Sequence, residues 1–139
     1  TVDAVALQDS EVCVLQFADL ERIAREFSPL QHQLHRVMSR EIVREHGVMV
    51  LLGSMRAEER VAAFLLNLSR RFETLGYSPL EFNLRMTREE IGSYLGLKLE
   101  TVSRTLSRFQ SDGLIEVANK RVRLIDLAAL RALLSPAPC

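Results

Sequence analysis

Three polar residues near the start of a segment with helical spacing, Glu100, Ser103 and Arg104, could together recognise base pairs. In the major groove of DNA, a carboxylate can accept a hydrogen bond from the amino group of cytosine, and an arginine can donate two hydrogen bonds to guanine. Glu100 and Arg104 are four residues apart, so on a helix they lie one turn apart on the same face. The alternative is an ordinary exposed ion pair.

The surrounding sequence predicts a helix-turn-helix with a wing. Thr87, followed by Glu90, has the pattern of a capping box, and Gly96 ends the short helix that the box begins. A second helix begins near Leu99, and its inward positions are Val102, Leu106 and Phe109. Two short helices joined by a glycine-containing turn, the second polar on its outer face, form a helix-turn-helix. The stretches LIEV and RVRLI, separated by ANK, predict a β-hairpin. Within this frame, base reading is favoured over the isolated ion pair.

Phosphate contacts would position such a domain on DNA and make its binding depend on salt. The residues placed for them are Thr87, Arg88, Lys98, Thr101 and Arg108. Residues 84–123 carry eight basic and five acidic side chains, whereas residues 1–56 carry six and eight. The formal net charge of the whole chain is zero, so only this uneven distribution, and not the bulk charge, favours a nucleic-acid partner.

A long helix is predicted over residues 28–54, with Ser28 as its N-cap and Pro29 at its first position. One row of its side chains is predicted to form the seam of a homodimer: Leu34, Met38, Ile42, Glu45, Met49 and Leu52. The dimer is favoured because so short a chain lacks enough other core to cover this helix. The alternative is a helix buried on two sides within a monomer. In a parallel pairing Glu45 would face its twin, which would weaken the dimer.

The first residues predict a β structure that this sequence does not complete. Residues 1–17 alternate in polarity and predict strand, with a turn at Asp9 and Ser10. Two strands alone are marginally stable, so we expect the end of a larger β domain here. Asp19 is expected to cap a short helix that runs to about Glu26. The fold expected is mainly α with small β: the β remnant and short helix in 1–27, a dimerisation helix in 28–55, and a winged helix-turn-helix in 56–139.

Composition excludes several classes of protein. Hydrophobic residues make up 47% of the chain and charged residues 26%, as in globular proteins, and no apolar run approaches the ~18 residues of a membrane span. The two cysteines, Cys13 and Cys139, lie at opposite ends and make no disulfide framework, so we expect a cytoplasmic protein with no membrane partner. No phosphate-binding glycine loop or nucleophile elbow is present, so we expect no enzyme activity.

Several motifs resemble the CRP/FNR superfamily of bacterial transcription regulators: NLSRRF, MTREEIGSYLGLKLETVSRTLSRFQSDGLI and the long helix before them. The spacing of Glu100, Ser103 and Arg104 is similar to that of the FNR (fumarate and nitrate reduction regulator) subgroup, which includes the ANR-type proteins. CRP-like members have an arginine where this chain has Leu99, and a glycine where it has Ser103. The resemblance covers about residues 11–134. It implies a homodimer that reads TTGAT-type half-sites in double-stranded DNA through those three residues.

The resemblance also implies a cofactor and a signal for the intact protein. FNR-type sensors hold an oxygen-labile 4Fe–4S cluster through three N-terminal cysteines and a fourth before the dimer helix, and Cys13 in SEVCVLQF resembles that fourth ligand. The alternative for Cys13 is a small buried hydrophobic side chain. A cluster needs four thiolates, so this chain is expected to be a C-terminal fragment without a cofactor of its own. The intact protein would regulate anaerobic genes in response to oxygen.

A second partner is implied for the loop at residues 73–81, which falls where FNR-type proteins present an activating surface to RNA polymerase. A solvated connection is the alternative for this loop. The main alternative for the whole chain is a helical dimerisation and winged-helix scaffold that binds other proteins without reading DNA.

Overall fold

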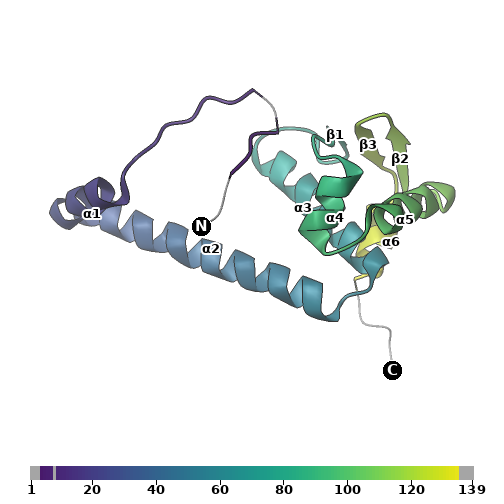
Figure 1. Cartoon of the computed structure of the whole chain (residues 1–139), viewed down its shortest axis with the longest axis horizontal. Coiled ribbons are helices and arrows are strands. Elements are labelled where there is room, and N and C mark those ends of the chain that lie inside the picture. The colour runs from purple at the N-terminus through teal and green to yellow at the C-terminus, as the bar shows by residue number, and fades with distance from the viewer. Residues whose placement is uncertain (1–3, 8, 135–139) are drawn as a thin grey trace. The chain divides into compact units, whose positions relative to one another are not determined.

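The computed structural model describes residues 4–7 and 9–134, and the side chains of residues 44–52 are outside the description. The chain divides into two compact units, Thr1–Gly53 and Ser54–Cys139, whose elements are labelled in Figure 1. The described residues are mostly helical and contain one small sheet, so the expected fold class is confirmed. None of the helices in the described ranges is long and apolar enough to cross a membrane.

The first unit contains α1 (Phe17–Glu26) and nearly all of α2 (Ser28–Ser54). The predicted end of α2 near Ser54 is confirmed. The N-cap role predicted for Ser28 is wrong, because Ser28 is the first residue of the helix and the carbonyl of Phe27 accepts the first hydrogen bonds, from the N–H groups of Leu30 and Gln31.

The capping role predicted for Asp19 is wrong, because α1 begins two residues earlier, with Gln16 in the N-cap position. Asp19 instead lies in the first turn, where a carboxylate complements the positive end of the helix, and it pairs with Arg22 at 3.4 Å.

The strand predicted over residues 1–17 is not formed in the described part of this segment, residues 4–7 and 9–16. Alternation alone does not make a strand, because a strand has to pair with a neighbouring strand, and the described sheet contains only β1, β3 and β2. Its apolar side chains remain exposed, with Val12 at 74%, Val14 at 87% and Leu15 at 76% of full exposure. The same holds for Cys13, which is exposed and so is not the buried strand residue of the alternative interpretation.

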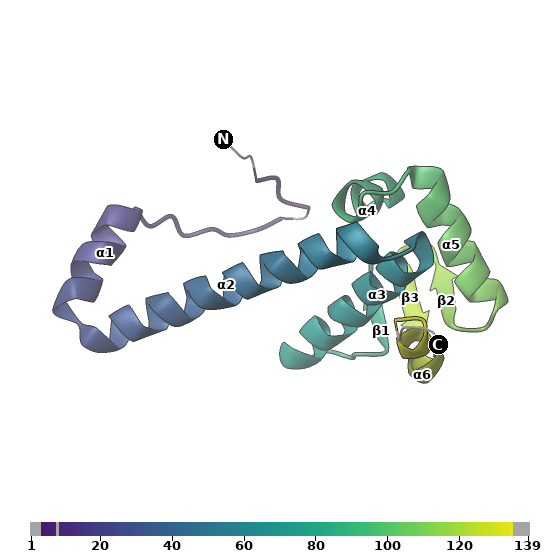
Figure 2. The ribbon, with the colours of Figure 1, turned by 90° about the horizontal axis from the view of Figure 1, so that it is seen from below.

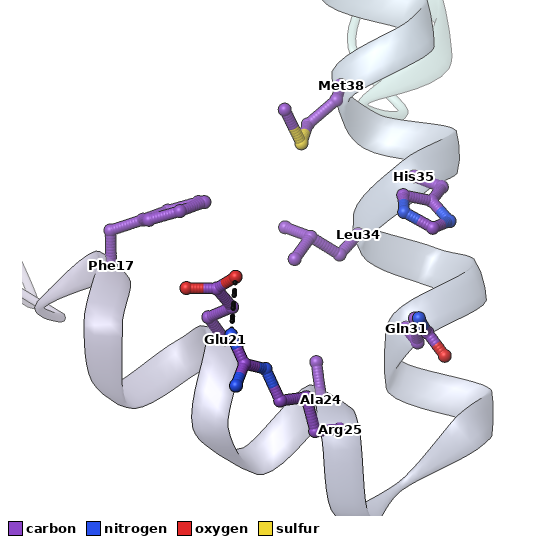
Figure 3. Close-up of a pocket in the computed structure, with 8 residues that line it drawn as sticks. All are labelled: Phe17, Glu21, Ala24, Arg25, Gln31, Leu34, His35 and Met38. Carbon is purple, nitrogen blue, oxygen red and sulfur yellow. Dashed lines mark hydrogen bonds and ion pairs between the residues drawn. The ribbon is translucent and has the colours of Figure 1, made fainter.

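A groove of about 180 Å³ lies between α1 and α2. Phe17 and Ala24 from α1 line one side of it, and Leu34 and Met38 from α2 line the other (Figure 3). Two residues of the predicted dimer seam therefore point toward α1. The cover that α1 provides is shallow, because Met38 keeps 47% of its exposure and no described side chain of α2 is buried.

The second unit packs helices around a three-stranded antiparallel sheet. Its elements are α3 (Ala57–Thr74), β1 (Glu81–Asn83), α4 (Arg88–Leu95), α5 (Leu99–Ser111), β2 (Ile115–Ala118), β3 (Arg121–Leu124) and α6 (Leu127–Ala132). The strand order is β1-β3-β2, with Phe82 and Val117 both opposite Val122. In Figure 2, α5 runs away from α4 and alongside β2, against which it packs.

One hydrophobic core joins these elements, and its fully buried members come from several of them. They include Val61 and Leu65 of α3, Ile91 of α4, Val102 and Phe109 of α5, Ile115 of β2, Val122 of β3 and Leu130 of α6. The helix α6 is absent from the sequence-based expectation. Its signal is Asp126, whose carboxylate accepts a hydrogen bond from the backbone N–H of Ala129 at 2.8 Å as an N-cap.

Two glycines shape the tight connection between α4 and α5. Gly96 ends α4 in the left-handed region at φ 63°, where a side chain is disfavoured. Gly92 lies inside α4, and a Cβ placed on it would approach the carbonyl oxygen of Leu97 to 2.5 Å. The backbones of the two residues are held together by a hydrogen bond of 2.8 Å, which the N–H of Leu97 donates to the carbonyl oxygen of Gly92. The turn therefore packs directly onto the backbone of α4.

We expect Gly92→Ala to lower the free energy of unfolding of the second unit by about 1–3 kcal/mol, because a backbone oxygen cannot move away as a side chain could. Urea unfolding monitored by circular dichroism would measure it. Gly53→Ala is the matched control: it also lies in a helix, but nothing is within 4 Å of the position that its added methyl group would take. Equal stability of Gly92→Ala and the parent chain would contradict this account of the turn.

Candidate nucleic-acid interface

The outer face of α5 presents the three residues predicted to read bases. Glu100 and Arg104 are exposed and Ser103 is partly exposed. The opposite face of the helix packs into the core, with Val102 at 0% and Phe109 at 2% exposure. Because a helix places its two faces on opposite sides, this burial fixes the outer residues toward solvent. The residues are thus brought together on one surface by the packing of their neighbours.

The ion pair that was the alternative role for Glu100 and Arg104 is not formed. Within residues 4–7 and 9–134, neither side chain has a hydrogen bond or an ion pair, although they lie one turn apart. Each keeps its hydrogen-bonding capacity for another molecule. An exposed pair of this kind contributes little to stability in any case.

The start of α4 is held by the predicted capping box. The hydroxyl of Thr87 accepts a hydrogen bond from the N–H of Glu90 at 3.2 Å, and the carboxylate of Glu90 accepts one from the N–H of Thr87 at 2.6 Å. These bonds to Thr87, with a smaller effect from the charge of Lys120, lower the pKa of Glu90. The side chain of Thr87 is among the groups that bond to this carboxylate, so its hydroxyl is engaged within the capping box.

Arg88, the first residue of α4, is only partly exposed. Its Nη1 is buried and has no hydrogen-bond partner among the described residues. Burial lowers the pKa of its guanidinium, because the charged form is desolvated. A buried donor without an acceptor is costly, and a movement of this partly exposed side chain onto an anionic ligand would remove that cost.

The other predicted phosphate contacts differ in their surroundings. Lys98 is exposed at the N-cap of α5 and makes no capping bond with its side chain, and Thr101 is partly exposed in the first turn. Arg108 is not free: it forms an ion pair with Glu58 of α3 and a second, at 3.7 Å, with Asp112. No local pattern predicted the first pair, because Glu58 lies 50 residues away in the chain.

Sequence reasoning also missed Arg60 of α3. Its guanidinium donates to the carbonyl of Leu95, the last residue of α4, at 3.1 Å, and to the carbonyl of Met55 at 2.9 Å. A cation at the C-terminal end of a helix complements the negative end of its dipole. Tyr94 reinforces the same contact between helices, with its ring centroid 5.9 Å from that of Phe64. Arg60 therefore helps to place α4, and with it the turn, on α3.

The described residues do not by themselves fit an iron–sulfur cluster. Cys13 is the single described thiol, and no group of three potential metal ligands is found within residues 4–7 and 9–134. Because a cluster of this type is held by four thiolates, no cluster chemistry follows from this chain alone.

Comparison with known proteins places this geometry in a family. The Crp-like helix-turn-helix domain matches residues 59–133, which is more than half of the chain. The chain belongs to the Crp-like helix-turn-helix family. The resemblance to CRP/FNR regulators is thereby confirmed, and the matched range contains α4, α5 and the hairpin of β2 and β3.

The relatives of this Crp-like chain are named as transcription regulators. It is 55% identical over 136 residues to the transcriptional regulatory protein btr of Bordetella pertussis, covering 98% of this chain and 56% of that protein. It is 46% identical over 132 residues to the transcriptional activator protein anr of Pseudomonas aeruginosa, covering 95% and 54%. The fumarate and nitrate reduction regulatory protein of Salmonella typhimurium is 46% identical over 130 residues, covering 94% and 52%. The chain spans about half the length of these relatives.

Solved structures share the Crp-like fold. FixK2 from Bradyrhizobium japonicum superposes with a TM-score of 0.78 at 34% identity, covering 87% of this chain and 60% of that one. A CRP-family transcriptional regulator from Thermus thermophilus gives 0.63 at 28% identity, covering 76% and 54%. The family consists of regulators and not of enzymes, in agreement with the sequence-based expectation.

The capping box predicts a pH dependence of stability for this Crp-like domain. Because the pKa of Glu90 is lowered on folding, its contribution is complete above the ordinary carboxyl pKa and is lost as pH falls through the lowered value. We therefore expect Glu90→Gln to unfold at lower urea than the parent at pH 7, and the gap to close as the pH falls below the ordinary carboxyl range. Glu89→Gln, in the same turn but outside the capping box, is the control. A gap that is independent of pH would contradict the role of the carboxylate.

Proposed function

We propose that this chain is the dimerisation and DNA-binding part of an FNR-type transcription regulator that reads palindromic, TTGAT-like sites. The observation that supports it most directly is the exposed, unpaired state of Glu100 and Arg104 on the outer face of α5, as far as the described residues extend. The inner face of α5 is fixed in the core, and its outer face offers the carboxylate of Glu100 as an acceptor and the guanidinium of Arg104 as a donor. Such a helix is suited to the major groove of DNA.

Each of the three residues has a distinct part in this proposal. Arg104 donates two hydrogen bonds to the O6 and N7 of the guanine in the half-site. Glu100 accepts one from the N4 amino group of a cytosine, which raises selectivity because a carboxylate repels phosphates and is tolerated only where it meets a donor. Ser103 contacts a neighbouring base edge or a thymine methyl group.

The phosphate contacts position this helix. We assign them to Thr87, Arg88, Lys98, Thr101 and Arg108, with unequal weight. Lys98 is exposed, and the partly exposed side chain of Arg88 would gain an acceptor for its unsatisfied donor by moving onto a phosphate. Arg108 must share its charge with Glu58 and Asp112, so its gain is smaller.

We expect Arg104→Ala to lose about 1–3 kcal/mol of discrimination between a TTGAT-N4-ATCAA duplex and a scrambled one, because a bidentate contact to guanine is removed. Glu100→Ala should broaden sequence preference more than it weakens non-specific binding. Fluorescence anisotropy titrations at fixed salt would measure both, with Arg131→Ala on α6 as the control. Loss of all binding in Glu100→Ala would contradict its reading role. Absence of binding even at low salt would favour the protein-interaction scaffold.

The proposed homodimer rests on the exposure of α2. Ile42 is 58% exposed and Met38 47%, and Leu34 is covered only in part, by α1. Apolar side chains in a row at helical spacing favour burial against a second helix. The remaining seam residues, Glu45, Met49 and Leu52, lie outside the described side chains, so the proposed weakening of the dimer by Glu45 stays a prediction.

We expect Ile42→Lys to shift the chain towards monomer by at least about tenfold in dissociation constant, since it places a charge in an apolar seam. Sedimentation equilibrium would measure the dissociation constant. Gln33→Lys is the matched control, because it lies nine residues away and so on the opposite side of the helix. Equal dissociation of Ile42→Lys and the parent would contradict the seam.

Two further parts of the proposal depend on the intact protein. Within residues 73–81, the connection between α3 and β1 exposes Leu75 and Tyr77, at 69% and 67%, and such apolar residues outside helix and strand suit a contact with RNA polymerase. Cys13 would supply one of four thiolate ligands to an oxygen-responsive 4Fe–4S cluster, and its exposure leaves the sulfur accessible. Support for the oxygen response comes from the relatives named as anr and as fumarate and nitrate reduction regulators.

A further inference from the structure

One arginine of α5 is held by acids although it continues the row of residues that is proposed to meet DNA. Glu100, Arg104 and Arg108 follow one another at intervals of four residues, so they lie in one row along the outer face of the helix. Arg104 has no ion pair within the described residues, whereas Arg108 pairs with Glu58 of α3 and with Asp112. The row therefore presents one open guanidinium and, one turn further on, one that is already occupied.

The two carboxylates engage Arg108 at different nitrogens of its guanidinium. Its Nη1 donates to Oε1 of Glu58, and its Nε lies 3.7 Å from a carboxylate oxygen of Asp112. A guanidinium binds a phosphate most strongly through two parallel hydrogen bonds, either from Nη1 and Nη2 or from Nε and Nη2. Because each of these pairs of donors contains an engaged nitrogen, Arg108 cannot make a bidentate phosphate contact unless a carboxylate moves away.

Packing holds Glu58 in the place where it meets Arg108. Glu58 lies in the first turn of α3, and Val61, three residues later, is buried in the same core as Phe109, the residue after Arg108. The helices α3 and α5 pack against each other through this core. The neighbouring acid, Glu59, accepts a hydrogen bond of 3.0 Å from the backbone N–H at the N-cap of α3. Of these two acids, Glu59 thus serves the start of its own helix and Glu58 reaches across to α5.

We propose that Glu58 is an affinity-limiting residue, whose carboxylate occupies Arg108 in the place of a phosphate and so weakens the binding of this chain to any DNA. This inference rests on the proposed DNA-binding function. The side chains of Arg108 and Glu58 are 63% and 40% exposed, so their pair contributes little to folding, and its main effect is on the next ligand of Arg108. Glu58 has a second effect, because its own charge repels a phosphate brought to the same place.

Removal of the carboxylate tests this role. We expect Glu58→Gln to bind both the TTGAT-N4-ATCAA duplex and a scrambled duplex about two- to fivefold more tightly per protomer, which is what an exposed ion pair of this kind is worth. The slope of log affinity against log salt should steepen by about 0.9 per protomer, since Arg108 becomes free to contact a phosphate. The ratio of the two affinities should stay that of the parent, because a phosphate contact carries no sequence information. Fluorescence anisotropy titrations at several salt concentrations would measure all three quantities.

Glu73→Gln is the matched control. It removes the same charge from the other end of α3, and Glu73 has no ion pair in the described part of the chain. We expect it to bind both duplexes as the parent does. Equal tightening by Glu58→Gln and Glu73→Gln would overturn the proposal, because it would indicate only the total charge of the domain. An unchanged affinity and slope in Glu58→Gln would overturn it as well.

A double substitution shows whether the effect passes through Arg108. In the parent chain, Arg108→Gln should lower the salt slope by clearly less than one contact. In the Glu58→Gln background, the same substitution should lower it by about 0.9 per protomer. Equal reductions in the two backgrounds would overturn the proposal, because the carboxylate would then not restrain the guanidinium. Urea unfolding of each variant would establish that the domain is intact.

The parent chain separates this inference from the function on which it rests. If the parent prefers the TTGAT duplex while Glu58→Gln behaves as Glu73→Gln does, the DNA-binding function stands and the role of Glu58 is wrong. If the parent binds neither duplex even at low salt, the DNA-binding function is wrong, and the role of Glu58 with it.

Discussion

The burial of the inner face of α5 is the constraint on which the interface depends. Val102, Leu106 and Phe109 are almost fully covered, and they fix the rotation of the helix about its own axis. Any loss of that packing would turn Glu100 and Arg104 away from a common surface. The turn before α5 adds the second restraint, because it rests on the backbone of α4 at Gly92 and cannot be displaced without opening the core. The hydrogen bond from Arg60 to the last residue of α4 joins that helix to α3 beside the same turn.

Charge pairing sets the electrostatic character of this surface. Residues 84–123 carry eight basic and five acidic side chains. Three of the eight basic side chains, Arg108, Arg121 and Arg123, form ion pairs with carboxylates. The effective positive field is therefore narrower than a count of basic residues suggests, and it follows α4, α5 and the tip of the wing. A narrow field is consistent with the base-reading role that we propose for Glu100, since strong attraction to any phosphate would obscure the selectivity of a carboxylate.

The first unit has the opposite character. Its apolar residues along α1, α2 and the segment before them remain largely exposed, and only Ala24 is buried among its described residues. Exposed apolar residues of this kind favour association, in keeping with the proposed dimer. The groove between α1 and α2 covers Leu34 from one side and leaves Ile42 open.

Much of the second unit followed from local sequence signals. The capping box at Thr87, the glycine at 96, the periodic core of α5 and the hairpin all depend on contacts within a few residues, and each was found where it was predicted. The end of α2 at Ser54 was also predicted, whereas its start was predicted one residue too late. The strand at residues 1–17 failed because strand formation needs a distant partner, which alternation cannot supply. Only the tertiary structure decided which charged side chains form ion pairs. Glu58 pairs with Arg108, which is 50 residues away in the chain, and Glu81 pairs with Arg121 on the neighbouring strand. Lys120 has no ion pair among the described residues. Pairing of this kind depends on which surfaces the fold brings together, and residue type alone does not reveal it.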